Sequence, residues 1–171
     1  MAPARRMRLA DWALGAVLCA LALLLVLDAQ ADIGNGPGGG VPLQTVLAAP
    51  ELPLVLAVEI PLQPALTFEV FEKIGLRAAF SPTRLAIALR AQLGRGRVET
   101  LCVAVTGAEL PARRLWQLER AWSGQETASP CLAELRAACA QDLPGNAARA
   151  RLALRLLMGH LADAGRRCPG D

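Results

Sequence analysis

The cysteines are the residues of this chain whose chemistry is easiest to specify. Cys102, Cys131, Cys139 and Cys168 lie in the second half, and a fifth, Cys19, lies in an apolar N-terminal segment. In an exported protein an even set of cysteines predicts disulfide bonds. Zinc binding is the alternative, but none of these cysteines has the Cys-x-x-Cys spacing of a structural zinc site. We therefore predict disulfides and no metal site.

The pairing of these cysteines depends on a helix predicted between two of them. Eight residues of helix would separate Cys131 from Cys139 by about 12 Å, whereas a disulfide requires Cα atoms within about 7 Å. Two pairings remain, Cys102–Cys139 with Cys131–Cys168, or Cys102–Cys131 with Cys139–Cys168. A predicted turn at 142–146 makes the last two helices antiparallel and returns the chain end toward Cys131. We therefore prefer the first pairing.

Other residues with catalytic potential are isolated in the sequence. His160 is the only histidine, and no nucleophile or carboxylate is demonstrably placed beside it. The glycine-rich stretch 36–40 lacks the Lys-Ser/Thr pair and the flanking strand of a phosphate-binding loop. Four acidic residues are most simply explained as solvent-exposed, namely Glu59, Glu69, Glu72 and Glu99. The sequence predicts no enzyme activity and no cofactor.

The first 31 residues have the pattern of a secretory signal peptide. Basic residues precede an apolar run at 12–27, and Ala29-Gln30-Ala31 has the small-x-small spacing of a cleavage site. An inner-membrane anchor at 12–27 is the alternative, but such a helix needs about 20 apolar residues. We predict cleavage after Ala31, a flexible leader at 32–52, and a periplasmic or secreted protein.

The middle of the chain is predicted to alternate strands and helices. Residues 54–60 are rich in β-formers, and apolar residues at Leu66, Val70 and Ile74 predict a helix over 65–74. A second strand is predicted at 76–80, whereas Val98–Val105 fits either a strand or a helix. The predicted core of this segment is Val58, Ile60, Leu66, Val70, Phe71, Leu76 and Phe80.

This order resembles the secretin and TonB short N-terminal (STN) domain. The resemblance covers about residues 54–110, and it rests on Ile60-Pro61-Leu62-Gln63-Pro64, Gly75-Leu76, Ser81-Pro82, Val98-Glu99 and Thr106-Gly107. It implies a small βαβ-type module that closes with a second helix from Val98 to Thr106. STN domains are non-catalytic and pass signals through protein contacts at the outer membrane, so the resemblance implies a protein-binding role in the cell envelope.

Beyond residue 110 the sequence predicts helices. Leu115, Leu118 and Trp122 recur at helical spacing within 110–122, and two further helices are predicted at 131–140 and 147–164. Pro-Gly at 144–145 marks the last turn. These elements predict a short helical hairpin or three-helix unit whose apolar stripe is core rather than a partner groove.

The predicted fold class is α+β, divided into a signal peptide (1–31), a leader (32–52), an STN-like module (53–110) and a helical segment (111–171). The net charge is +3, and no aromatic residues are interleaved with basic ones in a stripe, so nucleic acid is not expected as a partner. The predicted function is a periplasmic interaction module, accessory to envelope secretion or TonB-linked signalling. A disulfide-stabilised structural or inhibitory exported protein is the alternative.

Overall fold

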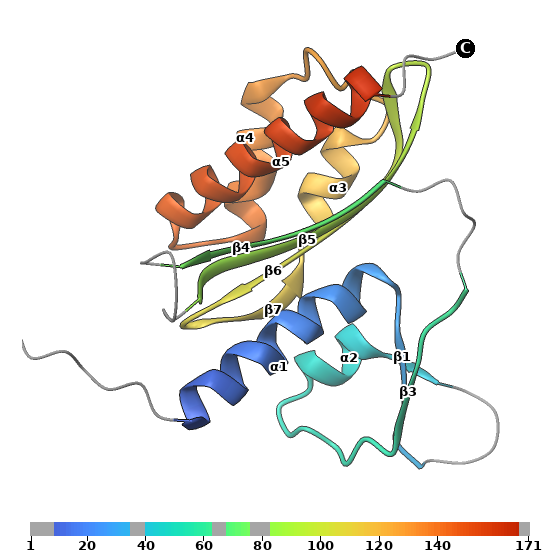
Figure 1. Cartoon of the computed structure of the whole chain (residues 1–171), viewed down its shortest axis with the longest axis vertical. Helices are drawn as coiled ribbons and strands as arrows, with labels where there is room; N and C mark the ends of the chain where they lie inside the picture. Colours follow the sequence, from blue (N-terminus) through green and yellow to red (C-terminus); the bar gives the residue numbers. More distant parts are fainter. Residues whose placement is uncertain (1–8, 35–39, 63–67, 76–82, 168–171) are drawn as a thin grey trace, which may run out of the picture.

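A four-stranded antiparallel sheet, sheet B, lies between two layers of helix (Figure 1). The computed structural model describes residues 9–34, 40–62, 68–75 and 83–167. Sheet B has the strand order β4-β5-β6-β7, and a small sheet, sheet A, has the order β2-β1-β3. The elements are α1 (Leu9–Val26), β1 (Gln30–Asp32), β2 (Val41–Pro42), α2 (Leu43–Ala48), β3 (Ala57–Glu59), β4 (Phe68–Gly75), β5 (Thr83–Gly94), β6 (Arg97–Gly107), β7 (Leu110–Arg114), α3 (Trp116–Trp122), α4 (Leu132–Asp142) and α5 (Ala147–Arg167). The fold is α+β, as predicted.

The two faces of sheet B carry side chains of different size. Successive residues of a strand point to opposite faces. Leu85, Ile87 and Leu89 of β5 therefore share one face, where they join the apolar core of α3, α4 and α5. Ala88 of β5 and Ala104 of β6 lie on the opposite face, in a second core with α1. The small alanine side chains let this helix lie close to the sheet.

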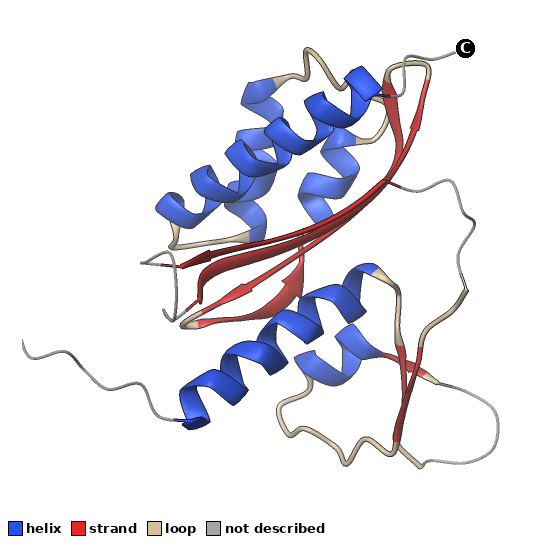
Figure 2. Ribbon diagram, in the orientation of Figure 1, coloured by secondary structure: helices blue, strands red, loops and turns tan. Residues whose placement is uncertain are grey.

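The three C-terminal helices cover the face with large side chains (Figure 2). Each of the three helices contributes a fully buried side chain to this core. They are Trp122 of α3, Leu135 of α4 and Leu157 of α5. The core extends without a break from β5 to α5, so it joins segments that the sequence assigned to separate units. The predicted helices at 131–140 and 147–164 are confirmed as α4 and α5.

The opposite face is covered by α1, which is followed by sheet A and α2. Ala22, Leu25 and Val26 of α1 are buried with Leu43 and Val46 of α2 in the second core. The expected flexible leader at 32–52 is therefore corrected in part, because it contains β2 and a helix with two buried residues. Among the described helices, none combines the length and the apolar character needed to cross a membrane.

The expected helix at 65–74 is wrong, because its described residues form strand β4. A spacing of four residues satisfies both a helix and a strand, since four is a multiple of the strand period. Val70 and Ile74 are half-buried, whereas Phe71 and Lys73 between them are exposed, which is the alternation of a strand. The expected closing helix at 98–106 is likewise corrected to strand β6. The predicted strand at 76–80 lies outside the described residues.

The predicted core of the middle segment is corrected for three residues. Val58, Ile60 and Phe71 are exposed, and Val70 packs against the core of the three helices. Leu66, Leu76 and Phe80 lie outside the described residues. The expected helix at 110–122 begins later than predicted, because residues 110–114 form β7 and only 116–122 form α3.

Candidate functional site

The end of α1 places a carboxylate beneath sheet B. The N–H of Asp28 donates to the carbonyl of Leu25 (3.3 Å), and the N–H of Ala29 donates to the carbonyl of Leu24 (3.0 Å), as in a Schellman motif. Asp28 has a φ of 54°, a left-handed conformation that glycine usually occupies. The helix dipole also opposes a negative charge at a helix C-terminus. These two local costs indicate that the Asp28 carboxylate has a tertiary role.

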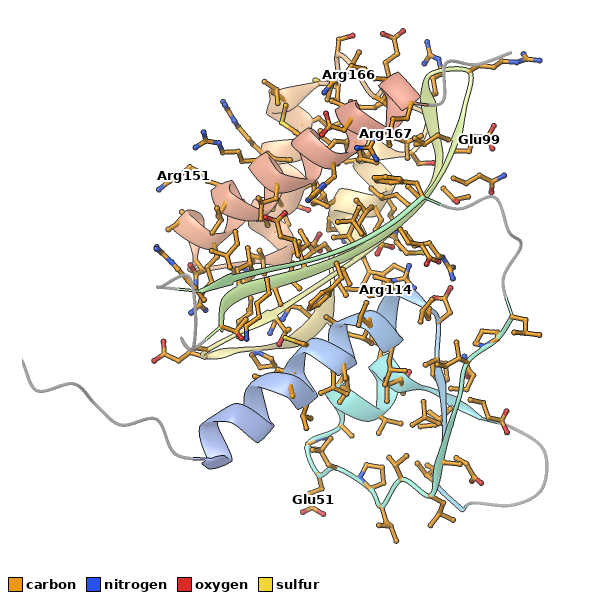
Figure 3. The ribbon with its side chains drawn as sticks, in the orientation of Figure 1. Glu51, Glu99, Arg114, Arg151, Arg166 and Arg167 are labelled. Carbon is orange, nitrogen blue, oxygen red and sulfur yellow. The ribbon has the colours of Figure 1, made fainter. Side chains whose placement is uncertain are left out.

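That role is to bridge two buried arginines of sheet B. Asp28 Oδ2 accepts a hydrogen bond from Arg90 Nη2 of β5 at 2.9 Å, and Oδ1 accepts from Arg114 Nη1 of β7 at 2.5 Å. The arginine side chains are 10% and 9% exposed, respectively. Figure 3 shows Arg114 between sheet B and α1. The ion pairs therefore fix the end of α1 to two strands of the sheet.

Arg114 also binds a buried carboxylate on α3. Its Nε and Nη2 donate to Glu119 Oε1 and Oε2 at 2.9 and 2.8 Å, a bidentate arrangement. Glu119 Oε1 also accepts from the Val103 N–H at 2.8 Å. The Trp116 ring lies over Arg114, 3.9 Å from Cζ to the ring centroid. We call Asp28, Arg90, Arg114 and Glu119 the Asp28 network, and it connects α1, sheet B and α3.

Burial and ion pairing act in opposite directions on the pKa values of Glu119 and Arg114. It raises the pKa of Glu119, although hydrogen bonds from Arg114 and Val103 act in the opposite direction. Burial lowers the pKa of Arg114, but the hydrogen bond with Glu119 and the charge of Glu119 leave that pKa raised overall. Cys102 Sγ lies 3.1 Å from Arg114 Nη2, and burial raises the pKa of this thiol more than the arginines lower it. The thiol stays protonated at neutral pH and is a poor nucleophile.

A cavity of about 420 Å³ opens beside the Asp28 network. The charge of Arg114 is already balanced there by two carboxylates, and Gln44 Oε1 is buried without a hydrogen-bond partner. The remaining walls are largely apolar. The lining residues are Leu25, Asp28, Ala29, Gln30, Pro42, Leu43, Gln44, Thr45, Arg114 and Trp116. This arrangement holds helices in place, and its lining contains no paired nucleophile and base.

A second groove runs between α5 and β4. His160 Nε2 of α5 and Glu72 Oε2 of β4 lie 2.6 Å apart, which ties the helix to this strand. The groove has a volume of about 410 Å³. It is lined by Glu72, Leu152, Arg155, Leu156, Gly159, His160 and Asp163. The single histidine is therefore paired with a carboxylate, which the sequence did not predict.

Among the described residues, the most exposed apolar surface lies on and around β3. Six large apolar side chains occupy alternate positions, with exposures from 42% for Val58 to 101% for Leu62. They are Leu52, Leu54, Leu56, Val58, Ile60 and Leu62, which we call the β3 strip. β3 pairs with β1 along one edge, and no described strand pairs with its other edge. The β3 strip thus combines exposed apolar groups with an open strand edge.

The predicted disulfide residues are separated in the structure. Cys102 and Cys139 are free thiols, and Cys131 forms no disulfide with a described cysteine. Cys102 lies with the α1 core and Cys139 in the core on the other face of sheet B, so the sheet separates them and the preferred Cys102–Cys139 bond does not form. Burial raises the pKa of Cys139 to about 11. Cys168 lies outside the described residues, so the Cys131–Cys168 bond stays a prediction.

The Asp28 network was not predicted from the sequence. The signal that could have revealed it is Arg90, a charged residue within the apolar run of β5. Such a residue requires a partner when it is buried. The partner is 62 residues away, and the sequence interpretation assigned it to the edge of a cleaved segment.

Comparisons with known proteins identify relatives in fold only. No family model matches the chain. No curated protein matches it either. Among solved structures, a chain of the cyanide-inactivated Cu,Mo-CO dehydrogenase is 17% identical with a TM-score of 0.61, over 84% of this chain and 54% of that chain. A chain of quinoline 2-oxidoreductase from Pseudomonas putida 86 is 17% identical with a TM-score of 0.60, over 87% and 56%.

A third solved structure gives the same result. A chain of the carbon monoxide dehydrogenase from Hydrogenophaga pseudoflava, in a form that lacks the Mo-pyranopterin moiety of the molybdenum cofactor, is 19% identical with a TM-score of 0.59. The match covers 85% of this chain and 56% of that chain. This chain thus spans about half the length of the chains it resembles, and at these identities the likeness shows the fold alone.

Proposed function

We propose that this chain is a non-catalytic protein-interaction module, and that its β3 strip binds an extended segment of a polypeptide partner. The observation that carries the proposal is the row of exposed apolar side chains at alternate positions along an open strand edge. An extended partner adds backbone hydrogen bonds to such an edge, and its alternate side chains contact the apolar row. Sequence and structure thus support the same class of partner.

Burial of the β3 strip against a partner would remove six exposed apolar side chains from water. Each leucine-sized side chain that becomes buried contributes about 1.5–3 kcal/mol. Soluble proteins that expose apolar groups on an open strand edge usually protect that edge with lysine, proline or a covering segment. Pro53 and Pro61 flank β3, which itself contains no lysine or proline, and no described strand covers its outer edge.

The charges around the β3 strip define the partner further. Residues 50–62 contain Glu51 and Glu59 and no lysine or arginine. Glu51 points away from the body of the protein on the segment between α2 and β3 (Figure 3). A complementary partner is therefore an extended segment in which apolar residues alternate with basic or neutral ones.

Site-specific crosslinking tests this proposal. A photoreactive benzoylphenylalanine at Val58 is expected to give a crosslinked product in cells, and the same group at Glu99 on the β5–β6 hairpin serves as the control. Leu56→Glu is expected to reduce the Val58 product at least tenfold, because it places a charge within the apolar row. A product at Val58 that is no stronger than at Glu99, or that survives Leu56→Glu unchanged, would contradict the proposal.

The location we propose for this interaction is the cell envelope. The N-terminal pattern of residues 1–31 supports it. Cleavage after Ala31 would remove Asp28 and divide β1, so the exported form would lack the ion pairs that hold α1 to the sheet. N-terminal sequencing of protein from the periplasm is expected to return Asp32. An intact chain in the membrane fraction would support the anchor alternative, and an intact chain in the cytoplasm would contradict both.

A second candidate is an interaction module within an oxidoreductase. The fold likeness to chains of CO dehydrogenase and quinoline 2-oxidoreductase favours it, since the TM-scores lie between 0.59 and 0.61 for the three structures. The β3 strip would then bind another part of the same enzyme. The identity of the protein crosslinked at Val58 separates the two candidates, because an envelope protein supports the first and an oxidoreductase subunit supports the second.

A further inference from the structure

We infer that the chain forms a homodimer with two-fold symmetry through the outer edge of β4 and the adjoining face of α5. This surface is distinct from the β3 strip, so the two proposals stand independently. Three observations carry the inference, namely an open strand edge, a strand and a helix that are each complementary to a second copy of themselves, and a hydrogen bond that aligns their centres.

The outer edge of β4 is available for pairing. β4 is the first strand of sheet B and pairs with β5, and no described strand lies on its other side. Phe71 lies opposite Ala88 of β5, on the face that α1 covers, yet the Phe71 side chain is 40% exposed. A strand of eight residues with an exposed aromatic ring and an unpaired edge favours the addition of another strand.

The sequence of β4 is complementary to itself in one antiparallel register. When Phe71 lies opposite Phe71 of a second copy, Glu69 lies opposite Lys73 of that copy, and Lys73 opposite its Glu69. These residues lie on the same face of the strand, because they are two positions apart. Aromatic pairs and opposite charges directly across an antiparallel pair stabilise it. The register therefore places Phe71 on the two-fold axis.

The groove face of α5 is complementary to itself in the same way. Arg155 and Asp163 line the groove four residues before and four residues after Gly159. Two antiparallel copies of α5 centred on Gly159 would therefore place each Arg155 near the Asp163 of the other copy. Asp163 pairs with Arg166 in its own helix, and a carboxylate has enough acceptor positions for both guanidinium groups.

Gly159 itself supports a close approach at this point. Glycine within a helix is less favourable than alanine, so its presence usually has a packing reason. A Cβ at Gly159 would meet nothing within 4 Å in one copy, so that reason does not lie within the chain. With strands about 4.8 Å apart and α5 in contact with β5, the two helices would lie about 10–14 Å apart, within reach of Arg155 and Asp163.

Phe71 of β4 and Gly159 of α5, the proposed centres of the two contacts, lie close to each other along the length of β4. Glu72 and His160 are hydrogen-bonded at 2.6 Å, and each is one residue beyond its centre, Phe71 in β4 and Gly159 in α5. A single axis perpendicular to sheet B can therefore pass between the β4 strands and between the α5 helices. Such an axis leaves both α5 helices on the same face and joins the two copies of sheet B into one continuous sheet.

The mass of the full chain in solution tests the dimer. At micromolar concentration, light scattering is expected to give twice the chain mass of 18.0 kDa. R155D alone and D163R alone are each expected to raise the dissociation constant at least tenfold, since each places like charges together. The double variant R155D/D163R is expected to restore the dimer, because the pair is re-formed with reversed charges. R136D, on the exposed surface of α4, serves as the control.

A covalent test locates the axis. Directly opposite residues of an antiparallel pair have Cα atoms about 4.5–5.5 Å apart, within disulfide range. With Cys131 and Cys168 replaced by serine, F71C is expected to form a covalent dimer on mild oxidation, and V58C is expected to remain a monomer on denaturing gels. A monomeric wild-type chain at micromolar concentration, a charge-swapped variant that fails to recover while it keeps its helical circular dichroism, or a covalent dimer through V58C instead of F71C would overturn the inference.

Discussion

Arg114→Ala is expected to lower the free energy of unfolding by about 3–5 kcal/mol, because it leaves a buried charge without its partner. Arg114 holds Glu119 through two hydrogen bonds, and the Glu119 side chain is only 7% exposed. The substitution also removes one of the two arginines that hold Asp28 at the end of α1. Urea unfolding at pH 7, monitored by circular dichroism, measures the difference.

Arg120→Ala is the matched control, since Arg120 is an exposed arginine on the same helix as Glu119. A substitution of this kind is expected to change stability by no more than about 0.5 kcal/mol. A loss below about 1 kcal/mol for Arg114→Ala would show that the Asp28 network is solvated in solution.

The stability loss of Arg114→Ala is also expected to depend on pH, and the direction of this dependence is set by the pKa of Glu119. Its pKa in the folded protein is raised above the ordinary value of 4.5, chiefly by burial. Its contribution to stability is therefore fully present below the pKa of the unfolded chain and is lost as pH rises through the folded pKa. Arg114→Ala removes a group that lowers this pKa, so the stability gap to the wild type is expected to be smaller at pH 4 than at pH 7.

Trp122→Ala is expected to cost about 3–5 kcal/mol, the usual cost of removing a fully buried aromatic side chain. Trp122 is 0% exposed at the end of α3, in the core shared with sheet B. Trp116 on the same helix is the control, because its ring is 41% exposed and its replacement by alanine is expected to cost about 1 kcal/mol or less. Chemical denaturation of both variants provides the comparison.

Phe71→Ala is expected to give different losses of stability under the predicted helix and under the observed strand, and the same denaturation experiment measures the loss. The predicted helix placed Phe71 in a core, which implied a loss of about 3–5 kcal/mol. The structure places it on an edge strand with 40% of its side chain exposed, so the expected loss in the monomer is below about 1 kcal/mol. A loss as large as that of Trp122→Ala at monomer concentrations would contradict the exposed position.

The elements that could be predicted are those with local signals. Helices α4 and α5 follow a Ser129-Pro130 start and a Pro144-Gly145 turn, and both carry apolar residues at helical spacing. β4 was misassigned because Val70 and Ile74 are four residues apart, which suits a helix and a strand equally. The exposed Phe71 and Lys73 between them distinguish a strand from a helix. Exposure is a property of the folded protein, so it could not be read from the sequence.

The Asp28 network had no local signal because its members are brought together by the whole fold. Arg90 and Arg114 are 62 and 86 residues from Asp28. The free cysteines illustrate the same limit, since Cys102 and Cys139 are placed on opposite faces of a sheet whose strand β6 the sequence left ambiguous. The presence of cysteines indicated possible disulfide bonds. Only the position of sheet B between Cys102 and Cys139 excluded the bond between these two.

The position of α1 beneath sheet B has a consequence for the order of events during synthesis. Arg114 is 86 residues after Asp28, so the ribosome must add those residues before the second ion pair of α1 can form. At about 5–20 residues per second this takes about 4–17 s. Until β5 and β6 have been synthesised, the sheet residues that bury α1, Ala88 and Ala104, are absent. If the chain is exported as proposed, export and docking of α1 compete kinetically, and the rate of elongation through β5–β7 sets the balance between them.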